Sequence, residues 1–252
     1  MSPLSGTTAA YMYQSRMDEN FVRPDPRSGD AGSNIKLLKF IRWLTFLVLA
    51  CSGALIISNS RVYFTTPMQA LFLMERPALA ASDYWRALLA VHVAGGAVCL
   101  VSLLIATLTS WNKVPGTLHR WSGRIYAVSV LGLLCPAGLL LTPYAKGGLP
   151  GKAAFLLLVI LTAGFTAEGV RYALKRNFKL HKRWMTRSMA MVASAMTFRM
   201  FQAVLGWSGA APEPNYVVSL YLSIFVNWLV IESWLGTFAS LLRPSSATKS
   251  EF

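Results

Sequence analysis

The chain has 252 residues, of which 54% are hydrophobic and only 13% are charged. Soluble domains contain about a quarter charged residues, so this composition excludes an ordinary soluble domain and predicts an all-α integral membrane protein. The net charge of +14 does not indicate nucleic-acid binding, because the basic residues lie in short segments between long apolar blocks.

Residues 1–35 are polar and contain four of the chain's ten acidic residues among prolines and glycines. This composition predicts a disordered cytoplasmic tail. The segment is not typical of a signal peptide, because it is acidic and the first apolar run starts late. A six-helix transmembrane domain is expected over 36–243, followed by a short cytoplasmic tail over 244–252.

The apolar blocks set the expected boundaries of the helices. The segment 59–83 is expected to be an outer loop that contains a short amphipathic piece at about 68–74, ended by Pro77. The connections at 112–116, 147–150 and 206–214 contain glycine or proline, and the connection at 175–182 is basic. Helices are predicted at about 40–58, 84–109, 119–141, 153–172, 183–205 and 216–242.

Basic residues are distributed unequally between the two sides of this predicted bundle. Eighteen of the 24 lie on one side: six before residue 43, three at 113–124, seven at 171–187 and two after residue 242. Five lie on the other side, and Arg199 lies within a helix. The positive-inside rule therefore predicts that both termini are cytoplasmic.

Arg199 is a cation where a membrane helix ordinarily has none. It lies about five helical turns after His181, so both residues are expected on one face, about 27 Å apart. The same face carries small or polar side chains and should look into the protein. Arg199 then either anchors an anion or joins helices through Gln202 and carbonyl groups.

His92 is followed on its own face by Gly95, Gly96 and Cys99. These small residues leave room either for a flat cofactor or for close helix packing. His92 and Arg199 lie at similar predicted depth, so we expect one polar intramembrane site with His92, Arg199, Gln202 and Glu232. Glu232 is the best candidate partner for a buried arginine, and Glu168 is expected to pair locally with Arg171.

Two similar segments, HRWSGR at 119–124 and HKRWMTR at 181–187, begin two of the helices on the predicted cytoplasmic side. Tryptophan and arginine are typical of interfacial anchors, but that role does not explain a histidine in both segments. We therefore hypothesise that His119 and His181 ligate the iron of one haem b. The propionates would be held by Arg120, Arg124, Arg183 and Arg187.

At these motifs the chain resembles domain-of-unknown-function family 2306, a group of predicted bacterial membrane proteins. The resemblance covers about 92–202 and rests on His92, HRWSGRIY at 119–126, HKRWMTRS at 181–188 and Arg199 in TFRMF. It implies a multi-helix protein of the bacterial cytoplasmic membrane, without an established activity. The histidines are also loosely similar to those of two-haem cytochrome b bundles, which need four histidines where this chain has three.

Three kinds of function stay open. A haem-b electron-transfer protein would use a redox partner or a quinone, and a small transporter would use a polar cavity around His92 and Arg199. A non-catalytic assembly subunit needs neither. A membrane-embedded enzyme is less favoured, because the sequence contains no HExxH motif, phosphate loop or Rossmann fingerprint. Three cysteines, all in apolar blocks, argue against a disulfide framework.

Overall fold

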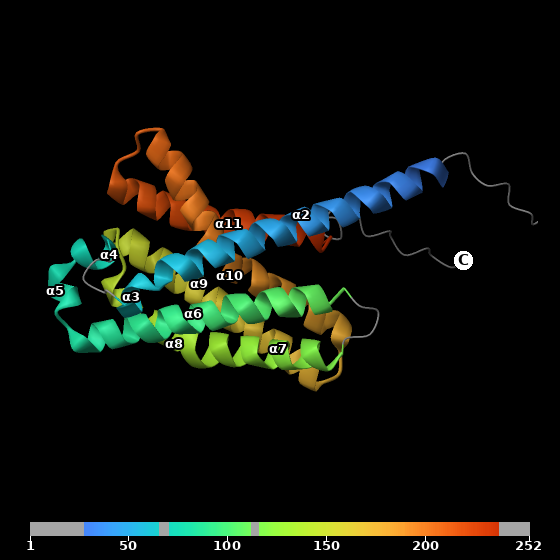
Figure 1. Ribbon diagram of the computed structural model, residues 1–252, viewed down its shortest axis with the longest axis horizontal. Coiled ribbons are helices and arrows are strands. Elements are labelled where there is room, and N and C mark those ends of the chain that lie inside the picture. Colours follow the sequence, from blue (N-terminus) through green and yellow to red (C-terminus); the bar gives the residue numbers. More distant parts are fainter. Residues whose placement is uncertain (1–27, 66–70, 112–115, 237–252) are drawn as a thin grey trace, which may run out of the picture. The chain divides into compact units, whose positions relative to one another are not determined.

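The computed structural model describes residues 28–65, 71–111 and 116–236, and these residues form helices and short connections without strands (Figure 1). Within them, six helical segments are long and apolar enough to cross a bilayer, which confirms the predicted number. The segments are Lys39–Thr65, Asp83–Thr109, Thr117–Tyr144, Gly148–Leu174, Phe178–Trp207 and Pro212–Trp234.

Residues from 48 onward form one compact unit, and residues up to 47 form another. Helix α2 (Ser28–Ser60) contributes to both units; before residue 48, the rings of Trp43 and Phe46 make an edge-to-face contact at 6.1 Å. The other elements are α3 (Val62–Thr65), α4 (Leu71–Met74), α5 (Pro77–Ala80), α6 (Asp83–Thr109), α7 (Thr117–Val128), η2 (Ser129–Leu134), α8 (Cys135–Leu141), η3 (Thr142–Tyr144), α9 (Gly148–Leu174), α10 (Phe178–Trp207) and α11 (Pro212–Trp234).

Several helices begin earlier than the sequence pattern predicts. The predicted basic loop at 175–182 is mostly helical, because the Asn177 side chain accepts a hydrogen bond from the Leu180 N–H and caps α10. Helix α9 starts at Gly148, since Pro150 fits a first helical turn. Residues 28–35, predicted to be disordered, belong to α2; the rest of that predicted tail lies outside the described residues.

The third transmembrane segment follows the predicted path but is not a uniform α-helix. Residues 129–134 form a π-helical segment, η2, between α7 and α8, and Pro136 stands in the first turn of α8. The hydrophobic pattern contained no sign of η2. Such segments widen a helix locally and are frequent at functional sites.

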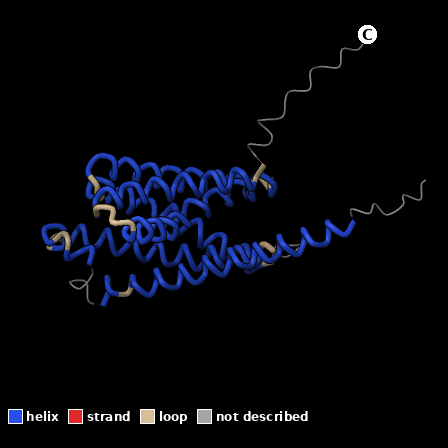
Figure 2. The backbone as a smooth tube through the Cα atoms, turned by 90° about the horizontal axis from the view of Figure 1, so that it is seen from above, coloured by secondary structure: helices blue, strands red, loops and turns tan. Residues whose placement is uncertain are grey.

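The helices pack as consecutive antiparallel neighbours (Figures 1 and 2). The first hairpin consists of α6 followed by α7, η2 and α8, and the second consists of α9 and α10, with α11 packed on α10. We call the end with the α6–α7 and α9–α10 connections the basic end, and the end with the α8–α9 and α10–α11 connections the opposite end. In this arrangement α7 and α10 both start at the basic end.

Small residues allow the helices to approach closely around the core. A Cβ atom placed on Gly95 of α6 would lie only 2.8 Å from Leu133 Cβ and 3.1 Å from the Leu134 nitrogen in η2. Cys99 and Tyr126 are almost fully buried beside this contact. Many large apolar side chains lie on the outside, which suits a protein surrounded by lipid.

Candidate functional site

His119 and His181 both contact a main-chain carbonyl at the basic end. His119 Nδ1 lies 3.2 Å from the carbonyl oxygen of Ala106 and 3.2 Å from the Thr109 hydroxyl in α6, and His181 Nδ1 lies 2.8 Å from the Gly169 carbonyl oxygen in α9. A carbonyl oxygen only accepts, so these carbonyl contacts favour a proton on Nδ1 of each ring. Neither Nε2 atom makes a hydrogen bond to any residue that the structure describes.

A buried hydrogen bond sets the register of the two helices that carry these histidines. The hydroxyl groups of Tyr126 in α7 and Ser188 in α10 are 2.7 Å apart. Each of them lies seven residues, or about two helical turns, after the histidine of its own helix. Because α7 and α10 start at the same end, His119 and His181 lie at about the same level of the bundle.

The same serine extends this contact into a chain of hydroxyl groups. Ser188 Oγ is 2.6 Å from the Thr166 hydroxyl of α9, which in turn donates to the Thr162 carbonyl at 2.6 Å. Tyr126, Ser188 and Thr166 are at most 1% exposed. Side chains from α7, α9 and α10 therefore meet in a buried polar cluster, which lies further from the basic end than the two histidines.

Of the four predicted propionate ligands, Arg187 has another partner. Its Nε and Nη2 atoms donate to the two carboxylate oxygens of Glu232 in α11, at 2.5 and 2.8 Å. The two side chains are 13% and 5% exposed, so this is a buried bidentate ion pair. Glu232 thus pairs with a buried arginine, as expected, but with Arg187 at the basic end.

The other three cations remain near the two histidines along their helices. Arg120 is exposed and donates to the Thr117 hydroxyl at 3.1 Å. The Arg124 guanidinium lies 5.2 Å from the centre of the Trp121 ring. Arg183 is half-buried in the second turn of α10. These three residues form the cationic part of the candidate site.

His92 is enclosed by the first hairpin and α9. Its Nδ1 lies 3.0 Å from the Leu134 carbonyl at the end of η2, and its ring faces Phe155 at 6.1 Å. A Cβ on Gly138 would lie 3.2 Å from the imidazole, so α8 passes directly beside it. The residue of α9 that faces His92 is a phenylalanine, which leaves this level of the bundle without a second histidine.

A family model described as a predicted membrane protein, domain-of-unknown-function family 2306, matches residues 89–235. The chain belongs to this family. The match covers both histidine hairpins and extends beyond the predicted limit at Gln202 through α11. Comparison with curated proteins and with solved structures gave no match.

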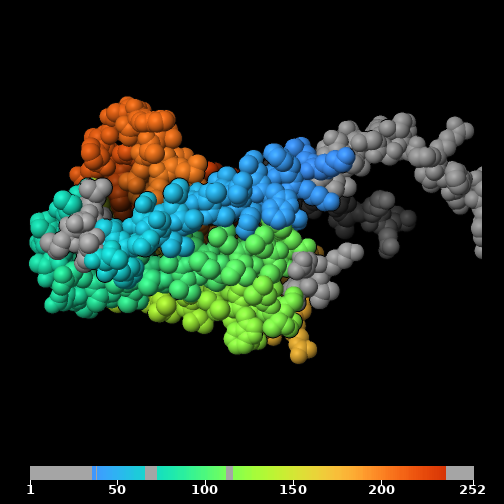
Figure 3. Space-filling view, in the orientation of Figure 1, coloured from blue at the N-terminus to red at the C-terminus, as the bar shows by residue number. Residues whose placement is uncertain are grey.

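In this member of family 2306, no hydrogen bond or ring contact of the described residues joins His92 to Arg199. All hydrogen-bond and ring contacts of His92 within the described residues are to Leu134 and Phe155. Arg199 is exposed, and its hydrogen bond goes to the Ala195 carbonyl of its own helix at 2.6 Å. The face of α10 that was expected to look inward is buried only at Ser188, and its other members are partly or fully exposed: His181, Ala195, Arg199 and Gln202. The last turns of α10 reach the surface beside α11 (Figure 3).

A ladder of polar side chains joins α10 to α11, and the sequence analysis missed it. The Asn227 amide donates to the Ala190 carbonyl and to the hydroxyl groups of Ser194 and Thr197, at 3.0 to 3.2 Å. The Asn215 amide donates to the main-chain carbonyl of Gln202 at 3.0 Å. Gln202, one of the predicted site residues, therefore lies at the contact between α10 and α11. The signal was a polar residue at every fourth position of α11: Asn215, Ser219, Ser223 and Asn227.

Proposed function

We propose that the chain is a haem-b-binding membrane protein in which His119 and His181 are the axial ligands at the basic end. Bound haem would supply reversible one-electron transfer, with a quinone or a protein as the redox partner. The proposal concerns one haem, because His92 faces Phe155 and has no second histidine at its level.

The observation that carries the proposal is the matched anchoring of the two imidazoles. A hydrogen bond from Nδ1–H to a carbonyl orients the ring, increases its basicity and leaves the Nε2 lone pair for a metal. His119 and His181 both have this arrangement, on two helices that start at the same end. An interfacial anchor alone would require neither the shared tautomer nor the shared level.

The donor set fits a haem with one change from the sequence hypothesis. Arg120, Arg124 and Arg183 are the cations that would bind propionates. Arg187 would instead keep Glu232 and hold α11 against α10, which fixes the helix that carries His181. The Tyr126–Ser188 bond would hold the two histidine-bearing helices in register.

The proposal is tested by the visible spectrum of protein purified from haem-replete cells. We expect one haem b per chain, with a sharp Soret band and split bands on reduction, as for low-spin iron with two imidazole ligands. His119→Ala and His181→Ala should each lose the haem or its low-spin spectrum. His92→Ala is the matched control and should keep both.

A colourless wild-type protein from such cells contradicts the proposal. Loss of the spectrum in His92→Ala alone would indicate that the haem binds in the opposite half of the bundle. The transporter alternative has less support, because the polar cavity that it requires around His92 and Arg199 is not formed by their contacts in the described residues.

A further inference from the structure

Arg199 is a cation at membrane depth whose charge no carboxylate of the described residues offsets. It donates only to the Ala195 carbonyl of its own helix, at 2.6 Å. A hydrogen bond to a carbonyl satisfies one N–H group but does not neutralise the guanidinium. Four carboxylates are engaged by other cations: Glu75 by Lys146, Asp83 by Arg86, Glu168 by Arg171 and Glu232 by Arg187.

The Arg199 side chain does not turn toward the nearer end of its helix. Side chains of an α-helix tilt toward its N-terminus, and the bond to Ala195 follows this tilt. The opposite end of α10 is reached only at Trp207, about 12 Å further along the helix axis. The guanidinium therefore points back along α10, away from the nearer end of the helix, which is not the direction expected of a side chain that snorkels to that end.

Two tyrosines interact electrostatically with this cation. The ring of Tyr216 in α11 makes an edge-to-face contact with Phe198, the neighbour of Arg199, at 5.2 Å. The charge of Arg199 acts on both Tyr63 of α3 and Tyr216, and Tyr216 also interacts, more strongly, with Arg76. The Tyr63 hydroxyl makes no hydrogen bond to a residue in the described part of the chain. The neighbourhood of Arg199 thus holds a phenol donor in addition to the guanidinium.

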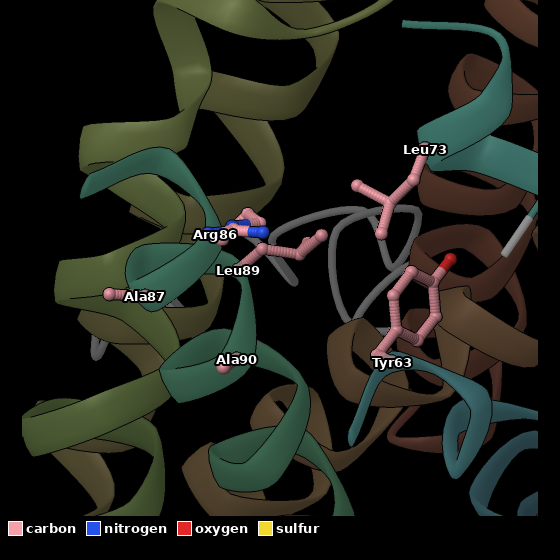
Figure 4. Close-up of a pocket in the computed structure, with 6 residues that line it drawn as sticks. All are labelled: Tyr63, Leu73, Arg86, Ala87, Leu89 and Ala90. Atoms are coloured by element: carbon pink, nitrogen blue, oxygen red, sulfur yellow. The ribbon is translucent and has the colours of Figure 1, made fainter. Parts of the chain in front are cut away.

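Tyr63 also lines an apolar hollow of about 260 Å³ at the opposite end. Figure 4 shows Tyr63 and Leu73 on one side of it, with Arg86 and Leu89 of α6 extending from the other. Arg86 is paired with Asp83, so the hollow presents mainly apolar side chains. Just after α4, Glu75 forms an ion pair with Lys146 at 2.7 Å.

We propose that Arg199, with Tyr63 and Tyr216, binds the phosphate group of an anionic membrane lipid, and that an acyl chain of this lipid enters the hollow beside Tyr63. An unpaired cation at membrane depth calls for an anion, and guanidinium and phenol groups are strong donors to phosphate oxygens. The adjacent apolar hollow distinguishes a lipid from a free anion. The site does not depend on haem at the basic end.

Native mass spectrometry of the full chain in detergent, with equal amounts of phosphatidylglycerol and phosphatidylcholine, tests this site. We expect one retained phosphatidylglycerol, preferred over phosphatidylcholine by at least about tenfold, since a charge-assisted hydrogen bond contributes that much. Arg199→Gln should remove the preference, and Tyr63→Phe should reduce it a few-fold. Arg61→Gln is the matched control, because Arg61 is an exposed arginine near the same end.

Four outcomes would overturn the assignment. Retention of the wild-type preference in Arg199→Gln would overturn it, and so would loss of the preference in Arg61→Gln, since either result would indicate general attraction to a basic surface. Displacement of the lipid by millimolar inorganic phosphate would indicate a site for a soluble anion. A dimer that disappears in Arg199→Gln would indicate that a carboxylate of a second chain is the partner of Arg199.

Discussion

The two histidine hairpins have the same plan but are held together by different contacts. In each, a 27-residue helix is followed by a short connection and a helix whose early histidine bonds back to a carbonyl of the first helix. The first hairpin relies on close backbone approach at Gly95, where η2 lies against α6. The second relies on the bond between Thr166 and Ser188 and on the attachment of α11 through Arg187.

This difference shows two ways of packing helices in lipid, where apolar side chains gain little by leaving the solvent. Small residues increase van der Waals contact between backbones, and buried polar groups make hydrogen bonds that lipid cannot replace. The first hairpin should therefore be sensitive to added volume, and the second to the removal of polar atoms.

The largest expected effect is in the second hairpin, at Glu232. Glu232→Gln leaves the Arg187 guanidinium buried without its counter-charge, so we expect the free energy of unfolding to fall by about 3–5 kcal/mol. Unfolding in mixed micelles with increasing dodecyl sulfate measures this loss. Glu168→Gln is the matched control: its pair with Arg171 is on the surface and should contribute at most about 1 kcal/mol. An equal loss of unfolding free energy in both variants would show that burial does not strengthen the ion pair between Arg187 and Glu232.

An intermediate effect is expected in the first hairpin at Gly95. Gly95→Ala places a methyl group against the backbone of η2 and should lower the free energy of unfolding by about 1–3 kcal/mol. Gly123→Ala in α7 meets nothing within 4 Å, and the same measurement should show a gain of about 0.5–1 kcal/mol from helix propensity. If both variants gain stability, backbone approach does not hold the first hairpin.

The smallest effect is expected where the hydroxyl chain joins the two hairpins. Ser188→Ala removes the partner of the buried Tyr126 hydroxyl and should cost about 1 kcal/mol in the same unfolding assay. Thr186→Ala, two residues earlier, removes an exposed hydroxyl bonded to its own helix and should change little. An unchanged Ser188→Ala protein would show that the register of α7 and α10 depends on packing alone.

The sequence was sufficient for the membrane-spanning helices, because long apolar blocks have few other stable structures. It also located the local pair of Glu168 and Arg171, which are three residues apart on one helix face. It did not predict η2, because a π-helical segment keeps the same composition as an α-helix. It missed the four-residue polar spacing in α11, whose importance depends on which helix lies opposite.

The candidate site could be predicted only in part. His119 and His181 were identified from the repeated pattern of histidine, cations and tryptophan, but their tautomers depend on carbonyls of other helices, Ala106 and Gly169. Depth alone suggested that His92 and Arg199 meet. Their separate surroundings follow from rotation about the helix axes, which depth along the axis does not specify.

The sequence by itself therefore determined the membrane environment, the six apolar helices and the two related histidine segments, since these follow from local hydrophobicity and spacing. Only the tertiary structure decided which polar groups become partners: Arg187 with Glu232, Ser188 with Tyr126 and Thr166, and Arg199 with no carboxylate among the described residues. The physical reason is that hydrogen bonds and ion pairs act over about 3 Å. At that range, the partner of each group depends on how the helices are rotated and packed.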